Sequence, residues 1–187
     1  CWKDLILPDD YTLRLVNLII FTKYLFYTKI FCSVSPCGNY VAACGFAPDV
    51  KIWTVKAAKG FDKVVRGFEC TGHTSGVFHM SWRSDSSHLA TISKDQTWKI
   101  FKIDPEFQSS NCVSTGKVKN MVVNSSSKVA LSPDGKVMAI AQEKNVLIYA
   151  LYPKAEFVTE IENVHTQIIN NILFSSCSKW LLTSGNF

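Results

Sequence analysis

Short hydrophobic runs of strand length recur along the chain and alternate with polar turns. Aromatic residues, Val, Ile, Thr and Ser are frequent in these runs, which favours β-strands over a helical bundle. Four runs contain small residues and directly follow a turn, as expected for buried inner strands. These predicted inner strands are Tyr40 to Cys44, His88 to Ile92, Val137 to Ala141 and Trp180 to Thr183. The pattern therefore predicts an all-β chain.

The turns ahead of these strands repeat a short motif, which is clearest in Val34-Ser35-Pro36-Cys37-Gly38 and Leu131-Ser132-Pro133-Asp134-Gly135. Trp82 to Ser86 and the degenerate Phe174 to Ser178 keep the same register. Measured from the leading hydrophobic residue, successive motifs are 48, 49 and 43 residues apart. This spacing indicates an internal repeat.

A second predicted strand follows each of the first three inner strands and ends on an aromatic residue. These blade aromatics are Trp53, Phe101 and Tyr149, and both intervals between them are 48 residues. Two independent landmarks thus share one period. Outer strands are expected at Val64 to Cys70, weakly at Asn111 to Lys117, and at Phe157 to Ile161.

A histidine precedes two of the turn motifs at matching places, in Gly72-His73 and Val164-His165. A period near ~45 residues, four short strands, a Gly-His opening and a terminal aromatic together resemble the WD40 repeat family of β-propellers. The resemblance implies a WD40 β-propeller fragment, an open arc of three blades plus part of a fourth.

The resemblance also implies a hydrogen-bonded network that locks each blade. In this family the network joins a histidine, a strand hydroxyl, a turn aspartate and a strand tryptophan. By position these are His73, Thr91, Asp95 and Phe101 in the second blade. Because Phe101 has no indole N–H, Thr91 is expected to lack one donor, and the network to be partial.

The other blades depart further from this network. In the first blade Trp53 is present, but Ala43 and Ala47 stand where the hydroxyl and the aspartate belong. His165 repeats the place of His73 without a visible aspartate. His79 and His88 fall on strands, and their rings are expected to be solvated or to form hydrogen bonds with nearby residues of the chain.

An enzyme has little support in the sequence. His73, Asp95 and Thr91 could in principle build a catalytic triad, but the repeat already explains their spacing. Phosphate-binding loops, dinucleotide-binding glycine motifs, zinc-protease motifs and the hydrolase nucleophile elbow do not occur. We predict no catalytic residues, no cofactor and no metal site.

The amino-acid composition is that of an ordinary globular protein, with 47% hydrophobic and 19% charged residues. The net charge of +5 comes from lysines dispersed along the chain, so nucleic acid is an unlikely partner. The seven cysteines contain no C-x-x-C pair, which leaves zinc unsupported and favours reduced thiols. Asn124-Ser125-Ser126 fits the glycosylation pattern but is interpreted as a plain polar loop.

Residues 1–32 form an atypical segment of uncertain structure ahead of the propeller at 33–187. The chain lacks a starting Met and is expected to be a fragment at that end. The hydrophobic stretch Leu13 to Val34 carries Arg14, Lys23 and Lys29, which disfavours a membrane span. The alternatives are buried or misfolding-prone strands, or a segment foreign to the domain.

The run from Val34 to Trp53, above all its Cys-Gly-Phe-x-Pro-Asp-Val-Lys-x-Trp part, is similar to the transducin beta-like branch of the WD40 family. The similarity extends over residues 33–187. It implies a non-catalytic adaptor that binds other proteins, tethered to the endoplasmic reticulum membrane by an anchor not visible in this chain. It also implies a role in stress signalling to translation, with an endoplasmic reticulum stress kinase as a partner.

An RNA- or ribonucleoprotein-binding propeller remains the alternative function. It is suggested by the sequence pI of about 8.8 and by five lysines in the second half of the chain. They are Lys117, Lys119, Lys128, Lys136 and Lys144. Asp134 and Glu143 dilute their charge. Because of this dilution, and because propellers present binding residues in loops on a rigid ring, the protein-interaction scaffold is favoured.

Overall fold

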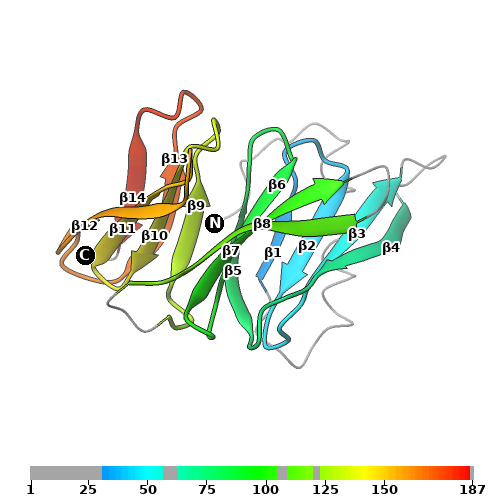
Figure 1. The fold of residues 1–187 in the computed structure, drawn as a ribbon, viewed down its shortest axis with the longest axis horizontal. Coiled ribbons are helices and arrows are strands. Elements are labelled where there is room, and N and C mark those ends of the chain that lie inside the picture. The colour runs from blue at the N-terminus through cyan, green and yellow to red at the C-terminus, as the bar shows by residue number, and fades with distance from the viewer. Residues whose placement is uncertain (1–30, 57–62, 105–108, 120–122, 186–187) are drawn as a thin grey trace, which may run out of the picture.

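The structure is a computed structural model that describes residues 31–56, 63–104, 109–119 and 123–185. These residues form fourteen antiparallel strands and no helix, so the fold is all-β (Figure 1). No helix in the described ranges is long and apolar enough to cross a membrane. Most of the stretch Leu13 to Val34 lies outside the described residues.

The strands form three four-stranded sheets and one two-stranded sheet, in chain order. The first blade contains β1(Phe31–Val34), β2(Tyr40–Cys44), β3(Val50–Lys56) and β4(Lys63–Cys70). The second contains β5(Val77–Trp82), β6(His88–Ser93), β7(Thr97–Asp104) and β8(Ser109–Lys117). The third contains β9(Lys128–Leu131), β10(Val137–Gln142), β11(Asn145–Ala150) and β12(Glu156–Ile161). The last sheet pairs β13(Ile169–Phe174) with β14(Leu181–Gly185).

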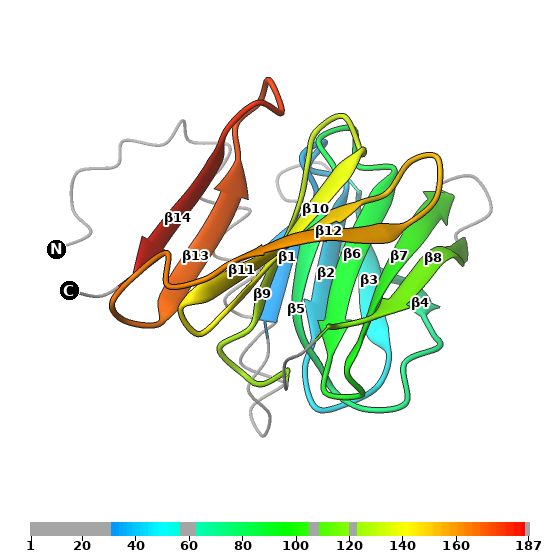
Figure 2. The same cartoon turned by 60° about the vertical axis from the view of Figure 1, so that its left-hand side comes forward.

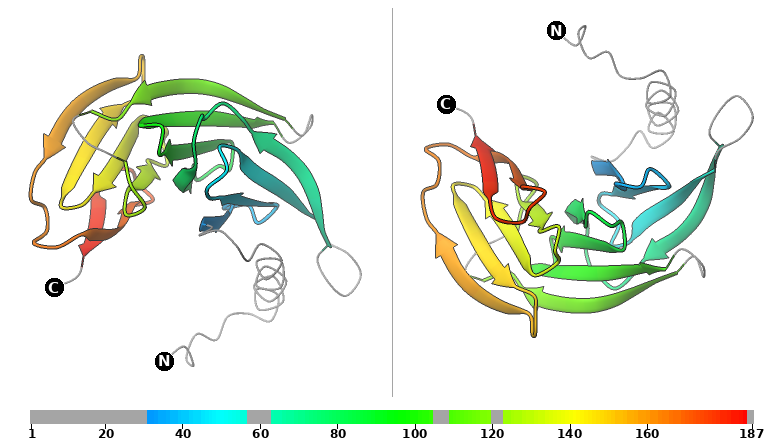
Figure 3. Two further views of the ribbon diagram at one scale, coloured as in Figure 1. Left: turned by 90° about the horizontal axis from the view of Figure 1, so that it is seen from below. Right: turned by 90° about the horizontal axis from the view of Figure 1, so that it is seen from above.

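The sheets follow one another in an unclosed arc, with the first blade at one end and the β13–β14 pair at the other (Figure 3). This is the expected partial propeller of three blades plus part of a fourth. The first strand of each sheet lies toward the inside of the arc. Figure 2 shows the β13–β14 pair beside the third blade, where Ile169 and Ile172 pack on its alanines.

Several strand boundaries differ from the sequence prediction; β3 and β7, for example, extend three residues past Trp53 and Phe101 instead of ending on them. The fourth inner strand begins at Leu181, because the N–H of Trp180 closes the preceding turn on the Ser175 hydroxyl at 3.1 Å. The Trp180 side chain is 73% exposed and is not part of the core. The outer strand expected to be weak is β8, which pairs with β7 along its whole length. The first blade begins with β1 at Phe31, two residues ahead of the expected domain boundary.

The repeated turn motif has one backbone geometry in all four copies. Its fifth residue has a positive φ in each case, and the N–H of that residue donates to the carbonyl three residues earlier at 2.8–2.9 Å. Glycine adopts this conformation without strain, whereas serine rarely does. The four residues are Gly38 (φ 74°), Ser86 (62°), Gly135 (72°) and Ser178 (61°).

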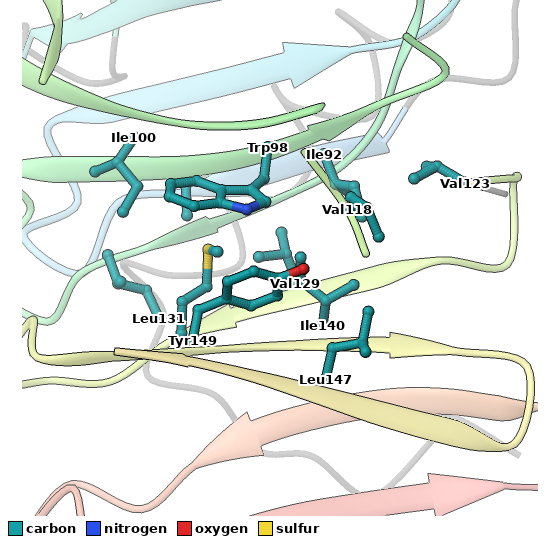
Figure 4. Packing of buried hydrophobic residues seen from close by; sticks show 12 residues of the cluster. Ile92, Trp98, Ile100, Val118, Val123, Val129, Leu131, Ile140, Leu147 and Tyr149 are labelled. Atoms are coloured by element: carbon teal, nitrogen blue, oxygen red, sulfur yellow. The ribbon is translucent and has the colours of Figure 1, made fainter. Parts of the chain in front are cut away.

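Hydrophobic side chains fill the spaces between successive blades. One alanine at the same place in each complete blade, Ala42, Ala90 or Ala139, is fully buried in the cluster that faces the following blade. In the cluster between the second and third blades, the rings of Trp98 and Tyr149 meet edge to face at 5.5 Å (Figure 4). Large aromatic and small aliphatic side chains therefore pack together between the blades.

Candidate functional site

His73, Thr91 and Asp95 meet at one end of the second blade. His73 precedes β5, Thr91 lies within β6, and Asp95 lies in the turn between β6 and β7. The imidazole Nδ1 of His73 is 2.9 Å from Asp95 Oδ2, and its Nε2 is 2.8 Å from Thr91 Oγ1. The structure thus brings together three of the four residues of the expected network through direct polar contacts.

Asp95 accepts hydrogen bonds from two further residues that the sequence reasoning missed. The backbone N–H of Thr74 and that of Thr97 each reach a carboxylate oxygen at 2.9 Å, and the Thr97 hydroxyl does so at 2.6 Å. Burial by itself raises the pKa of Asp95, but the bonds from Thr97, Thr74 and His73 outweigh it and lower the pKa to about 2. The signal in the sequence was Asp-x-Thr, in which an aspartate caps the backbone two residues later.

The protonation of His73 follows from this carboxylate. Burial lowers the pKa of His73 more than Asp95 raises it, so the neutral ring is favoured. Because Asp95 is ionised, the Nδ1–H donates to it and the free Nε2 accepts the Thr91 hydroxyl proton. The Thr91 oxygen also lies 3.2 Å from the Lys99 carbonyl, but its single proton serves the shorter contact.

Phe101 lies next to this network without a polar contact. Its ring is 1% exposed and meets the His73 ring edge to face at 6.3 Å between centroids. The other two blade aromatics, Trp53 and Tyr149, are also buried. The Tyr149 hydroxyl accepts the Lys119 N–H at 3.1 Å, so it ties the strand to the linker that enters the third blade.

The last sheet repeats half of the network. His165 Nε2 is 2.9 Å from Thr183 Oγ1, and the two residues have the same sequence separation as His73 and Thr91. In the first blade, Ala43 occupies the place of Thr91 and forms no such bond. The hydrogen-bonded network is therefore present in the second blade, and its His–Thr half is repeated in the last sheet.

The burial of this network argues against a catalytic role. Thr91 is 0% exposed, and the side chain of His73 is also 0% exposed. A nucleophile and a base in this position have no access to a substrate. Within the part of the chain that the structure describes, no cluster of His, Cys, Asp or Glu is arranged to hold a metal ion.

His79 is placed differently from the expectation of local or solvent partners. It is partly buried in β5, where its Nδ1 accepts the N–H of Val129 from the next blade at 3.2 Å and its ring packs on Phe31. Burial and nearby Lys128 lower its pKa to about 3. His88 does have a local partner, because its Nδ1 lies 2.6 Å from the Ser87 hydroxyl.

An open pocket of about 320 Å³ lies on the face of the arc opposite the four repeated turns, since Gly45, Phe46 and Lys94 follow the inner strands that those turns precede. Three successive blades contribute to its wall. The residues that line it are Gly45, Phe46, Phe78, Lys94, Val123, Asn124 and Ser125. Sequence reasoning could not find this pocket, because its wall comes from loops that are far apart in the chain.

Gly76 allows the backbones of the first and second blades to approach each other closely beside this pocket. A Cβ at Gly76 would lie 2.8 Å from the Gly45 carbonyl oxygen and 2.9 Å from Phe46 Cα, so only glycine allows this approach. The Gly76 carbonyl accepts the Lys94 N–H at 2.9 Å. On the other side, Val123 donates its N–H to the Gln96 side chain at 2.8 Å. The wall of the pocket is therefore fixed by the close approach at Gly76 and by these two hydrogen bonds.

Comparison with known proteins agrees with this architecture. The model of the family "WD domain, G-beta repeat" matches residues 64–102, which extend from β4 through β7. Transducin beta-like protein 2 of Homo sapiens is 36% identical over 159 residues, and that of Mus musculus is 34% identical over 158. This chain is a WD40 repeat chain that resembles transducin beta-like protein 2.

The similarity covers 82% of this chain but 35% of each of these two relatives, so the chain spans about a third of their length. A more distant similarity, 27% over 175 residues, links it to echinoderm microtubule-associated protein-like 2 of Homo sapiens. WD40 repeat proteins are generally scaffolds that bind other proteins, and this chain has the architecture of one.

Proposed function

We propose that this chain is part of a non-catalytic protein-interaction scaffold that binds partners through the face of the arc that carries the pocket. The observation that carries the proposal is the pocket itself, which three rigidly joined blades line and beside which the Phe46 side chain is 61% exposed. Large exposed aromatic groups beside a preformed pocket are typical of protein-binding surfaces. The buried His73 network contributes rigidity rather than chemistry.

The resemblance to transducin beta-like protein 2 supports a more specific role. We propose that the intact protein acts as an adaptor associated with the endoplasmic reticulum membrane, in stress signalling to translation. An endoplasmic reticulum stress kinase is then a partner to look for. Membrane association would come from an anchor outside the described residues.

Affinity purification of the intact protein from stressed and unstressed cells tests this role. We expect a stress kinase and components of translation control to co-purify, and we expect the protein to fractionate with endoplasmic reticulum membranes. Purification without protein partners under both conditions would contradict the scaffold. Fractionation away from these membranes would contradict the location while leaving the scaffold role standing.

The alternative, RNA binding, loses support from the positions of its five lysines. Lys119 packs its ammonium on the Phe157 ring at 4.3 Å, and Lys128 is half-buried with its ammonium 3.3 Å from the Ser126 carbonyl. Lys136 and Lys144 flank opposite ends of β10. They therefore form no continuous stripe for a phosphate backbone. Affinity for RNA that falls steeply with added salt would revive this alternative.

A further inference from the structure

Three polar side chains line the pocket, those of Lys94, Asn124 and Ser125, and each offers a hydrogen-bond donor. Lys94 is the one charged residue among its lining residues, it is exposed, and no ion pair of its ammonium occurs within the described ranges. The Asn124 side chain uses its oxygen internally, since Oδ1 accepts the N–H and the hydroxyl of Ser126. This leaves the Asn124 amide N–H₂ and the exposed Ser125 hydroxyl available beside Lys94.

The rest of the lining is apolar. Phe46 is exposed at the rim, Phe78 packs on the core between the second and third blades, and Val123 is buried behind them. A ligand that fills this volume must therefore bring an apolar group. It must also bring an acceptor, and a negatively charged acceptor matches the Lys94 ammonium best.

We propose that this pocket binds an acidic peptide segment of a partner protein, with an apolar side chain against Phe46 and Phe78 and a neighbouring carboxylate bonded to Lys94. The proposal rests on the scaffold function and specifies the chemistry of the partner. The Asn124 amide and the Ser125 hydroxyl then bond the second carboxylate oxygen or a peptide carbonyl. Charge complementarity and the apolar wall together select such a segment over a basic or a purely polar one.

The pocket also explains why the partner must meet an assembled arc. Gly45 and Phe46 come from the first blade, Phe78 and Lys94 from the second, and the loop after Val123 leads into the third. Because the Gly76 and Gln96 contacts fix these three parts, the ligand meets a wall that is already formed. Binding to a preformed wall avoids the entropic cost of ordering loops.

Binding of the full chain to arrays of short peptides tests the inference. One array pairs each large apolar residue with Asp or Glu at nearby positions, a second replaces the acids by Asn or Gln, and a third replaces them by Lys. We expect members of the acidic array to bind about tenfold or more tightly than their matched amide and lysine versions. The inference is wrong if no acidic peptide binds better than its matched versions.

Two variants at exposed positions locate the binding. Lys94→Glu should weaken binding of the acidic peptides by about tenfold or more and improve binding of the lysine peptides. Phe46→Ser should weaken binding of both sets. The control variants Lys136→Glu and Tyr152→Ser make the same changes at exposed sites outside the pocket, and they should bind like the parent. Equal binding by Lys94→Glu and the parent would contradict the assignment.

The same variants separate this inference from the scaffold function. In one outcome the intact protein with Lys94→Glu keeps all its co-purified partners, while only the parent binds acidic peptides. The pocket then binds acidic segments, but the co-purified partners bind elsewhere on the protein. If partners are retained and no acidic peptide binds, the inference fails and the scaffold stands. If neither partners nor peptides bind the parent, both fail. Binding of RNA or of a second copy that Lys94→Glu abolishes, without peptide binding, would assign the pocket to that ligand instead.

Discussion

The backbone N–H of Cys37 donates to the hydroxyl of Ser86 in the neighbouring blade at 3.0 Å. The last joint repeats this arrangement, where Asp134 donates to Ser178 at 3.1 Å. Both serines occupy the turn position with positive φ that glycine fills in the other two copies. At both places a serine in a strained conformation therefore links two blades through its side chain.

Substitutions of Ser86 can separate the contribution of its hydrogen bond to Cys37 from the backbone strain of its positive φ. Ser86→Ala removes the hydrogen bond and keeps the Cβ in the left-handed region, whereas Ser86→Gly removes both. We expect the alanine variant to lower the free energy of unfolding by about 1 kcal/mol more than the glycine variant does. Chemical denaturation of the full chain measures the difference, and Ser178 offers a second copy of the experiment. Equal stability of the two variants would argue against a strained turn.

Gly116 allows Trp98 to pack flat on the backbone of β8. A Cβ at this position would lie 2.5 Å from Trp98 Cζ2 and 2.7 Å from Cε2, inside contact distance. Gly116→Ala should therefore cost about 1–3 kcal/mol, because the ring is 2% exposed and has little room to move. Asn111→Ala, at an exposed position on the same strand, should be nearly neutral. A stable Gly116→Ala variant with unchanged tryptophan fluorescence would contradict this packing.

His79 should make the joint between the second and third blades sensitive to acid. Its pKa is lowered from 6.5 to about 3 in the folded chain, by burial first and by Lys128 second. The unfolded chain therefore takes up the proton first as the pH falls. The stability contribution is fully present above about pH 6.5 and is lost as the pH falls toward 3.

The His79→Leu variant provides the comparison, since it removes the titrating group. Its stability should change less between neutral pH and pH 4 than that of the parent. It should also be less stable at neutral pH, because the Val129 N–H loses its acceptor. Parallel stability curves for the two proteins would show that His79 does not titrate on unfolding.

The repeat itself could be predicted from sequence, because turn motifs and terminal aromatics depend on local chemistry and recur at a fixed interval. The contacts between blades could not. His79 is expected to have a local partner, yet it accepts a backbone N–H fifty residues away. Thr74 completes the Asp95 site through a bond that depends on how the strands are placed, whereas the Thr97 bonds are local and follow from the Asp-x-Thr sequence. The pocket depends on three blades at once, so no single stretch of sequence encodes it.

The cysteines should fall into two reactivity classes. In Cys37 and Cys177 hydrogen bonds from Ser35 and Ser175, among others, lower the pKa, outweighing the effect of burial at Cys37. Burial raises the pKa of Cys44 and of Cys70 to about 12. Mass spectrometry after brief alkylation near neutral pH should find the first pair modified and the second pair intact. Alkylation of Cys44 and Cys70 as fast as Cys37 would contradict the described burial.

The contact between His73 and Asp95 tests the WD40 register most directly. A double-mutant cycle of His73→Ala, Asp95→Ala and the combined variant, measured by denaturation of the full chain, isolates the coupling between the two side chains. Asp95→Ala alone should cost about 1–3 kcal/mol, because it leaves the buried His73 N–H without its acceptor. We predict a coupling of at least about 1 kcal/mol, consistent with a charge-assisted bond at 2.9 Å. A coupling near zero, or an Asp95→Ala variant as stable as the parent, would mean that the two residues are not partners and would contradict the blade register.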